Sequence, residues 1–219
     1  MTDALRLARM LQFADSAFPG GGFAFSWGLE TALAEGTADR RDLRAWIAQD
    51  LRGRWHPFDR LVLAGGHRLA GAALADWAAT VDAHVALERQ RQASLQSGEA
   101  LIAAARAIGL PCDPVIEALR DRGHGHFALV HGHLLRGAGL DLAAALVVSA
   151  SGAARQALSV AVRLNALGAI GTQRELLALQ PLIAALAGDL PDGTEPLSSF
   201  APLAEIALMR PRPDRLFVN

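Results

Sequence analysis

Four of the seven histidines lie close together in the chain, at His124, His126, His131 and His133. Neutral imidazole is a ligand that suits nickel, zinc or copper. Residues seven apart share one face of a helix, so His126 and His133 could approach one ion, whereas His131 and His133 point to nearly opposite sides. The i, i+4 histidine pair of helical zinc sites is absent, and the stretch contains no carboxylate. The pattern favours structural histidines, and it leaves a helical metal-binding protein or hydrolase using the His124–His133 cluster as the alternative.

A second stretch that could do chemistry is the run Pro19-Gly20-Gly21-Gly22-Phe23. A phosphate-binding loop requires a Lys-Ser/Thr pair after its last glycine, but Phe23-Ala24 follows here and the chain has no lysine. The lack of lysine also excludes Schiff-base chemistry, and no serine stands in a Gly-x-Ser-x-Gly motif. The sequence therefore indicates no catalytic activity.

The composition indicates the kind of body that must position these stretches. A chain of 219 residues that is 52% hydrophobic is large enough for one compact domain with a sizeable core. The formal net charge of -1 gives no bulk attraction to nucleic acid or to an anionic membrane. One cysteine, Cys112, predicts a reducing, cytoplasmic location. The longest strongly apolar run, from Leu142 to Ala154, is predicted to be too short to span a membrane.

Alanine and leucine dominate, and apolar residues recur every three or four positions, so the sequence predicts an all-α fold without strands. We expect a single-domain multi-helix bundle, with a helical body over about 1–188 and a loop, a short helix near Pro202–Met209 and an extended tail over 189–219. The helices are expected at Asp3–Ala14, from Phe25 to near Gly36, from Asp39 to about Leu51, from Pro57 toward Ala75, at Trp77–Ala107 as one helix or two, from Pro114 to Gly123, and at His126–Arg136, Leu140–Arg163 and Thr172–Ala187.

Three local signals mark where helices begin. Asp39 is expected to cap the helix that carries Trp46, and Asp113-Pro114 is expected to start the helix that follows. Thr172-Gln173-Arg174-Glu175 resembles a capping box. Within Leu140–Arg163, the small residues 149–154 would permit close helix approach, so we expect this helix at the centre of the bundle or at a dimer seam.

The glycine-rich run also carries a resemblance to a known family. A proline and three glycines among four aromatic residues predict a constrained corner between helices. The run resembles the N-terminal signature of the UreF-type urease accessory proteins, through Pro19, Gly21, Gly22, Phe23, Ser26, Gly28, Leu29 and Glu30.

Further stretches resemble the same family in the expected order. His126-Phe127 with Gly132 is similar to one family segment, and Arg163, Leu164, Gly168 and Gln173 are similar to another. The chain end Arg215-Leu216-Phe217 resembles the family's Arg-Leu-Phe tail. The sequence departs from the family pattern at Ala128 and Ala169, and Met209-Arg210 replaces a His-Glu pair.

The resemblance implies a non-catalytic, all-helical urease maturation chaperone. Members of the family dimerise, bind the accessory protein UreD (also called UreH) and with it recruit the nickel-carrying GTPase UreG, and the assembly inserts nickel into apo-urease. The family binds no cofactor tightly, although nickel is thought to pass through the complex. By resemblance we expect a cytoplasmic homodimer that binds UreD partly through Arg215, Leu216 and Phe217, and that binds neither nucleic acid nor membrane. An adaptor for another metalloenzyme is a further alternative.

Overall fold

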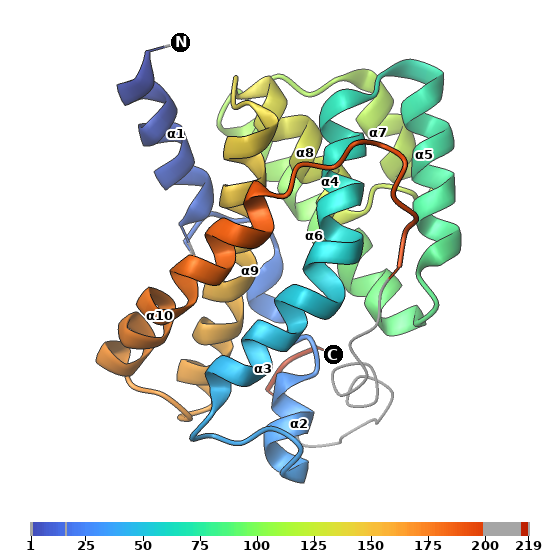
Figure 1. Cartoon of the computed structure of the whole chain (residues 1–219). Helices are drawn as coiled ribbons and strands as arrows, with labels where there is room; N and C mark the ends of the chain where they lie inside the picture. Colours follow the sequence, from blue (N-terminus) through green and yellow to red (C-terminus); the bar gives the residue numbers. More distant parts are fainter. Residues whose placement is uncertain (1, 16, 199–215, 219) are drawn as a thin grey trace.

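The computed structural model describes residues 2–15, 17–198 and 216–218, with only the backbone of Phe23. These residues form helices and connections without a strand, which confirms the all-α prediction (Figure 1). The helices are α1 (Asp3–Ala14), η1 (Gly22–Ala24), α2 (Leu29–Glu35), α3 (Leu43–Asp50), η2 (Leu51–Asp59), α4 (Arg60–Arg68), α5 (Gly71–His84), α6 (Glu88–Ala107), α7 (Pro114–Asp121), α8 (Phe127–Gly137), α9 (Leu142–Arg163) and α10 (Ala169–Gly188).

Helix α9 runs through the middle of the molecule, as the small residues 149–154 led us to expect. It contacts α1, α2, α4, α8, α10 and the two η segments (Figure 1). Ala150 and Ala154 are fully buried, and Leu158 continues the same face into the main hydrophobic core. A second core, centred on Leu129 and Leu134 of α8, lies between α8 and the helices α4 to α7. The two cores together hold every long helix in place.

Helices α3, η2 and α4 form one continuous rod from Leu43 to Arg68 (Figure 1). Its central part, η2, is wound as a π-helix and contains Pro57, which has no N–H to give to the helix. The wide turns allow the helix to pass through the proline, so Pro57 lies inside the rod and does not begin a helix. The rod then ends at Arg68, and α5 begins anew at Gly71, which corrects the predicted helix toward Ala75.

Helices α4 and α8 cross so closely that only glycine fits at the crossing. A Cβ atom added to Gly66 would lie 2.1 Å from the carbonyl oxygen of Leu129, and one added to Gly132 would lie 2.1 Å from that of Leu63. Real Cβ atoms do not approach oxygen so closely, so each glycine is fixed by the backbone of the other helix. This crossing positions the N-terminal half of α8, which carries His131.

Two of the three local signals for helix starts were wrong. The aspartate that caps α3 is Asp42, whose carboxylate accepts a hydrogen bond from the Ala45 N–H, whereas Asp39 accepts one from the Arg41 N–H in the preceding turn. The capping box at Thr172 is also wrong, because α10 begins at Ala169 and the Thr172 hydroxyl donates to the carbonyl of Gly168 inside the first turn.

The stretch Trp77–Ala107 forms two helices, because α5 ends at His84 and α6 begins at Glu88. The remaining expected helices, including Asp113 as the cap of α7, agree with the structure to within a few residues. The expected helix Pro202–Met209 lies outside the described residues.

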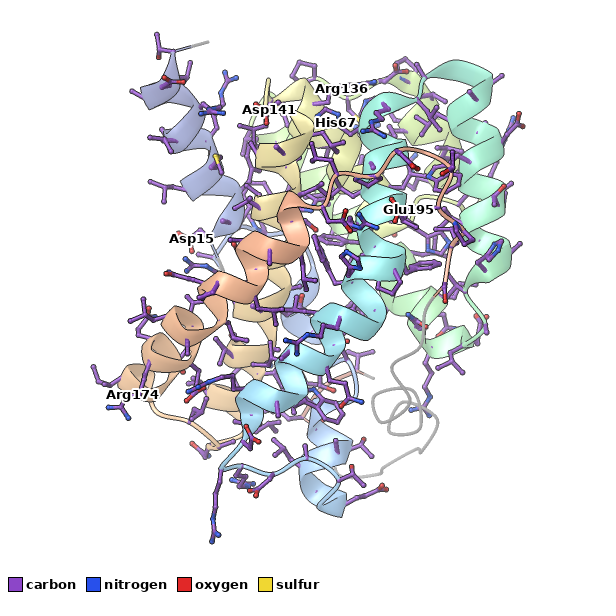
Figure 2. All side chains as sticks on the ribbon, in the orientation of Figure 1. Asp15, His67, Arg136, Asp141, Arg174 and Glu195 are labelled. Atoms are coloured by element: carbon purple, nitrogen blue, oxygen red, sulfur yellow. The ribbon has the colours of Figure 1, made fainter. Side chains whose placement is uncertain are left out.

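Beyond α10, residues 189–198 cross the rod as an extended strap (Figure 1). The guanidinium of Arg60, only 1% exposed, donates to the carbonyl of Asp189 and pairs with the carboxylate of Glu195. Figure 2 labels Glu195 on the strap. Arg68 donates to the carbonyl of Pro191, and the Ser198 N–H donates to the carbonyl of Pro57. The strap is thus held onto α4 and η2 along its whole length.

The apolar run from Leu142 to Ala154 was predicted to be too short to span a membrane, but the helix that contains it is longer than this run. Among the described residues, α9 is the one helix that is long and apolar enough to cross a membrane, at 22 residues. Half of its most apolar stretch is buried inside the protein, and α10 and α1 cover it. This is the burial expected of the central helix of a soluble protein.

Candidate functional site

The glycine-rich loop between α1 and α2 takes backbone conformations that explain its glycines. Gly21 and Gly28 have φ angles of 77° and 83°, which side-chain-bearing residues rarely adopt. A Cβ atom on Gly21 would also lie 2.9 Å from the Cα atom of Ser97 on α6. Trp27 has a positive φ of 51°, and Phe25 is extended, so α2 begins only at Leu29 and excludes Phe25. The predicted constrained corner is confirmed in its geometry.

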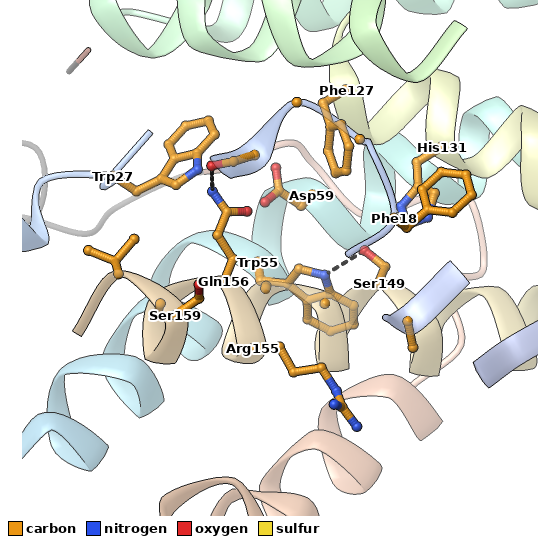
Figure 3. Close-up of a pocket in the computed structure, with 18 of the residues that line it drawn as sticks. Phe18, Trp27, Trp55, Asp59, Phe127, His131, Ser149, Arg155, Gln156 and Ser159 are labelled. Carbon is orange, nitrogen blue, oxygen red and sulfur yellow. Dashed lines mark hydrogen bonds between the residues drawn. The ribbon is translucent and has the colours of Figure 1, made fainter. Parts of the chain in front are cut away.

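Gln156 of α9 fastens this loop from the inside. Its amide nitrogen donates to the carbonyl oxygen of Gly22 at 2.9 Å and approaches that of Phe25 at 3.4 Å (Figure 3). A side chain at Gly22 would collide with this amide group. The loop therefore lies as a roof over α9, with a space beneath it.

That space is a cavity of about 410 Å³. Its walls come from the glycine-rich loop, α9, the rod and the start of α8 (Figure 3). The aromatic lining residues are Phe13, Phe18, Trp27, Trp46, Trp55 and Phe127; the charged and polar ones include Asp15, Asp50, Arg54, Asp59, His131, Ser149, Arg155, Gln156, Ser159 and Arg163. A mainly apolar enclosure with a few convergent polar groups is typical of a binding or transit site.

One side of the cavity carries a charged group of three residues from the rod. Arg54 makes two hydrogen bonds to Asp50, at 2.8 and 2.7 Å, and pairs with Asp59 on its other side. The face of Trp27 lies 5.0 Å from this guanidinium. One guanidinium cannot compensate two carboxylates fully, so burial raises the pKa of Asp59 although Arg54 opposes that shift.

His131 faces the same cavity from α8 (Figure 3). It is 7% exposed, its ring lies 5.1 Å from that of Phe127, and its Nδ1 atom has no hydrogen-bond partner. Burial lowers the pKa of His131 to about 4, because no neighbouring carboxylate supports the imidazolium. His131 is therefore neutral at physiological pH and presents an unused nitrogen. Nearby, the Trp55 indole donates to the Ser149 hydroxyl at 3.0 Å.

The chain end docks beside this cavity. Phe217 is 3% exposed, and its ring lies 4.0 Å from the guanidinium carbon of Arg163. The buried carboxylate of Glu30 accepts hydrogen bonds from the N–H groups of Leu216 and Phe217. Leu216 is 58% exposed. Glu30 of the glycine-rich signature and Arg163 of a later family-like stretch thus meet at the tail.

Comparison with known proteins decides the family. The UreF family model matches residues 37–180. Urease accessory protein UreF of Rhizobium etli (strain CIAT 652) is 33% identical over 210 residues, which cover 93% of this chain and 91% of the relative. Urease accessory protein UreF of Cereibacter sphaeroides (strain ATCC 17029 / ATH 2.4.9) is 33% identical over 211 residues, with 93% of each chain covered. The chain belongs to the UreF family. The predicted resemblance is confirmed.

The structure gives the signature residues of this UreF-family chain different tasks. Ser26, Gly28, Leu29 and Glu30 are buried around the start of α2, whereas Pro19 is exposed. Gly168 is the N-cap residue just before α10, Leu164 is partly buried against the main core, and Gln173 is exposed. The side chain of Phe23 and all of Arg215 lie outside the described part of the structure.

The four clustered histidines do not share a site. His126 contacts Asp82 at 2.9 Å and Ser94 at 3.2 Å, and His124 lies 3.9 Å from the same aspartate. His133 contacts Arg136, and His131 faces the cavity. Across the described residues, no group of three or more histidine, cysteine or acidic side chains is placed to hold a metal ion.

Asp82 is the residue that sequence reasoning missed in this cluster. It lies on α5, far from His126 in sequence, and also binds Arg91 at 2.7 Å. Asp82, His126 and Ser94 form a chain of contacts like that of a hydrolase, but Ser94 also accepts the Phe127 N–H and none of these three lines the cavity. Asp82 joins α5 and α6 to the start of α8, which is the structural role the histidine spacing favoured.

Proposed function

We propose that this protein is a urease maturation chaperone, a non-catalytic adaptor that binds UreD and with it recruits the nickel-carrying GTPase UreG. The observation that carries the proposal is the match to proteins named urease accessory protein UreF over 93% of the chain. The assembly would insert nickel into apo-urease in the cytoplasm. Within it, this chain would act as a homodimer and would bind no cofactor of its own.

Several exposed apolar side chains support an adaptor role. Leu7 and Leu11 of α1 are 56% and 73% exposed, and Ile170 and Leu177 of α10 are 76% and 66% exposed. Large apolar side chains that stay exposed in groups mark surfaces that other proteins cover. The tail adds Leu216, at 58% exposure, as the residue of the predicted UreD contact that a partner could reach.

The cavity supports a role in the passage of nickel, the cargo of the proposed assembly. The neutral imidazole of His131 and the carboxylate of Asp59 both line it, and nitrogen and oxygen donors suit divalent nickel. Since no described group supplies three ligands, we expect the cavity to hold the ion only weakly. A transit path needs such weak holding, whereas a storage site does not.

Co-expression with UreD and UreG tests the proposal. We expect the three proteins to elute as one complex in size-exclusion chromatography and urease made beside them to contain nickel. Substituting Leu216→Glu should weaken the complex at least about tenfold, because it places a charge in an apolar contact. Ile108→Glu is the matched control, because Ile108 is 49% exposed between α6 and α7.

Two outcomes would contradict the proposal at different levels. Failure of the wild-type protein to join UreD and UreG would refute the adaptor role, and would favour an adaptor for another client. A complex that forms equally well with Leu216→Glu would refute only the part of the tail in UreD binding. Nickel content of the isolated protein, measured by mass spectrometry, distinguishes passage from tight binding.

A further inference from the structure

Residues 216–218 lie in a site that binds them through their backbone. Both oxygens of the Glu30 carboxylate accept N–H groups, one from Leu216 and one from Phe217 at 3.1 Å. The Val218 N–H donates to the Ala24 carbonyl at 2.9 Å. Three consecutive amide groups of the tail are therefore bound by acceptors that belong to the glycine-rich loop and to the first turn of α2.

The side chains of the docked tail alternate between the protein and the solvent. Phe217 is 3% exposed and belongs to the main hydrophobic core, whereas its neighbours Leu216 and Val218 are 58% and 59% exposed. Arg163 covers the buried ring, with 4.0 Å between the guanidinium carbon and the ring centre. The site thus recognises the segment by one aromatic side chain and by main-chain donors.

One of the groups that bind the tail, Arg163, also lines the cavity, as do the loop residues Gly22 and Ser26 on either side of Ala24. On its inner side, the same loop is held by Gln156 through the carbonyls of Gly22 and Phe25. The loop is therefore held from two sides, by the Gln156 side chain of α9 and by residues 216–218 at the chain end.

We propose that the Glu30–Arg163–Ala24 site is a receptor for the segment Leu216-Phe217-Val218, and that its occupancy fixes the roof of the cavity. The chain end is then a latch. When the tail leaves, Glu30 loses two amide donors while it is 8% exposed, and Phe217 leaves a gap beneath Arg163. The loop loses its outer support, and the wall at Gly22, Ser26 and Arg163 loosens. The inference concerns this chain alone and holds whichever client the family member serves.

Hydrogen exchange of the full-length protein tests the latch. The probes are the N–H groups of Phe25 and Leu29, which bond to Gly22 and Ser26 within the roof. In Phe217→Ala these two amides should exchange at least about tenfold faster than in the wild type, because the latch is weakened. In the matched control Leu216→Ala, which removes an exposed side chain from the same segment, their exchange should stay within about twofold.

A peptide added in trans provides the second arm. The synthetic peptide Arg-Leu-Phe-Val-Asn, added to Phe217→Ala at up to about 1 mM, should restore slow exchange, because it refills the vacant receptor. The same peptide with alanine in place of phenylalanine should not restore it. If Phe217→Ala loses its helical circular dichroism, Val218→Pro replaces it, because proline removes the N–H given to Ala24 and keeps the Phe217 side chain.

Unchanged exchange at Phe25 and Leu29 in Phe217→Ala and in Val218→Pro would overturn the proposal. So would equal acceleration in Leu216→Ala, because the effect would not then depend on the receptor. A peptide that fails to restore protection would refute the receptor. Restoration by the peptide but not by its alanine analogue would support both the receptor and the latch.

Discussion

The sharpest prediction concerns His131 and the pH dependence of stability. In the folded protein burial lowers the pKa of His131 to about 4, while an unfolded histidine titrates near its ordinary value of 6.5. Between these two pH values, His131 is mostly protonated in the unfolded chain and mostly neutral in the folded chain. The contribution of His131 to the free energy of unfolding is therefore fully present above pH 6.5 and is lost as the pH drops toward 4. The difference between the two pKa values corresponds to about 3 kcal/mol.

The perturbation is His131→Leu, which removes the titrating group and keeps an apolar side chain of similar size. The free energy of unfolding would be measured by urea titration, followed by tryptophan fluorescence, at several pH values between 7.5 and 4.5. The wild type should lose up to about 3 kcal/mol more than the variant across this range. His126 and His133, whose pKa values burial also lowers, remain in both proteins and cancel in the comparison.

His84→Leu is the matched control, because His84 lies exposed at the end of α5. It should leave the pH dependence as in the wild type. Equal pH dependence of the wild type and His131→Leu would refute the reasoning, because His131 would then titrate in the folded state as it does in water. That result would mean that the cavity is wet enough, or close enough to a carboxylate, to hold the imidazolium.

Two further predictions follow from packing and hydrogen bonding. Gly66→Ala should destabilise the protein by about 1–3 kcal/mol in the same urea assay, because its Cβ would lie 2.1 Å from the Leu129 carbonyl. The control Gly152→Ala, in open space on α9, should stabilise the protein by up to about 1 kcal/mol. If Gly152→Ala proved the more destabilising of the two, the α4–α8 crossing would be looser than described. Gln156→Leu should lower the free energy of unfolding by about 1–3 kcal/mol, because two loop carbonyls lose their hydrogen-bond donor. The exposed control Gln180→Leu should change it little. Equal effects of the two substitutions would show that Gln156 does not hold the loop.

The helices could be predicted because their signals are local. The apolar face of α9 and the Asp113-Pro114 start of α7 are short-range patterns, and the structure keeps both. The failures arose where two local signals compete. Asp39 and Asp42 can both cap a helix, and the burial of Leu43 selects the second. Thr172 was a plausible cap, but α10 starts earlier, at Ala169.

The candidate site could be predicted only in part, because its members come from distant segments. The sequence indicated a constrained loop at Gly21 and Gly22, and the closeness of Ser97 and Gln156 explains why glycine stands there. It did not indicate the cavity beneath the loop, nor that His131 faces it while its neighbours in the cluster turn elsewhere. Spacing on one helix determines which residues share a face, but not which helix covers that face.

Glu30, Arg163 and Phe217 show how the sequence pattern and the structure complement each other. Each belongs to a different family-like stretch. From the sequence alone, Glu30 and Arg163 were signature positions and Phe217 was a predicted partner contact. In the structure one buried carboxylate, one guanidinium and one aromatic ring form a single site. In the docked tail Leu216 and Val218 are exposed while Phe217 is buried, so a partner that binds this arrangement would favour the docked tail. Binding of a partner to the exposed side chains of the tail and closure of the cavity roof would then be coupled through Glu30, Arg163 and Phe217.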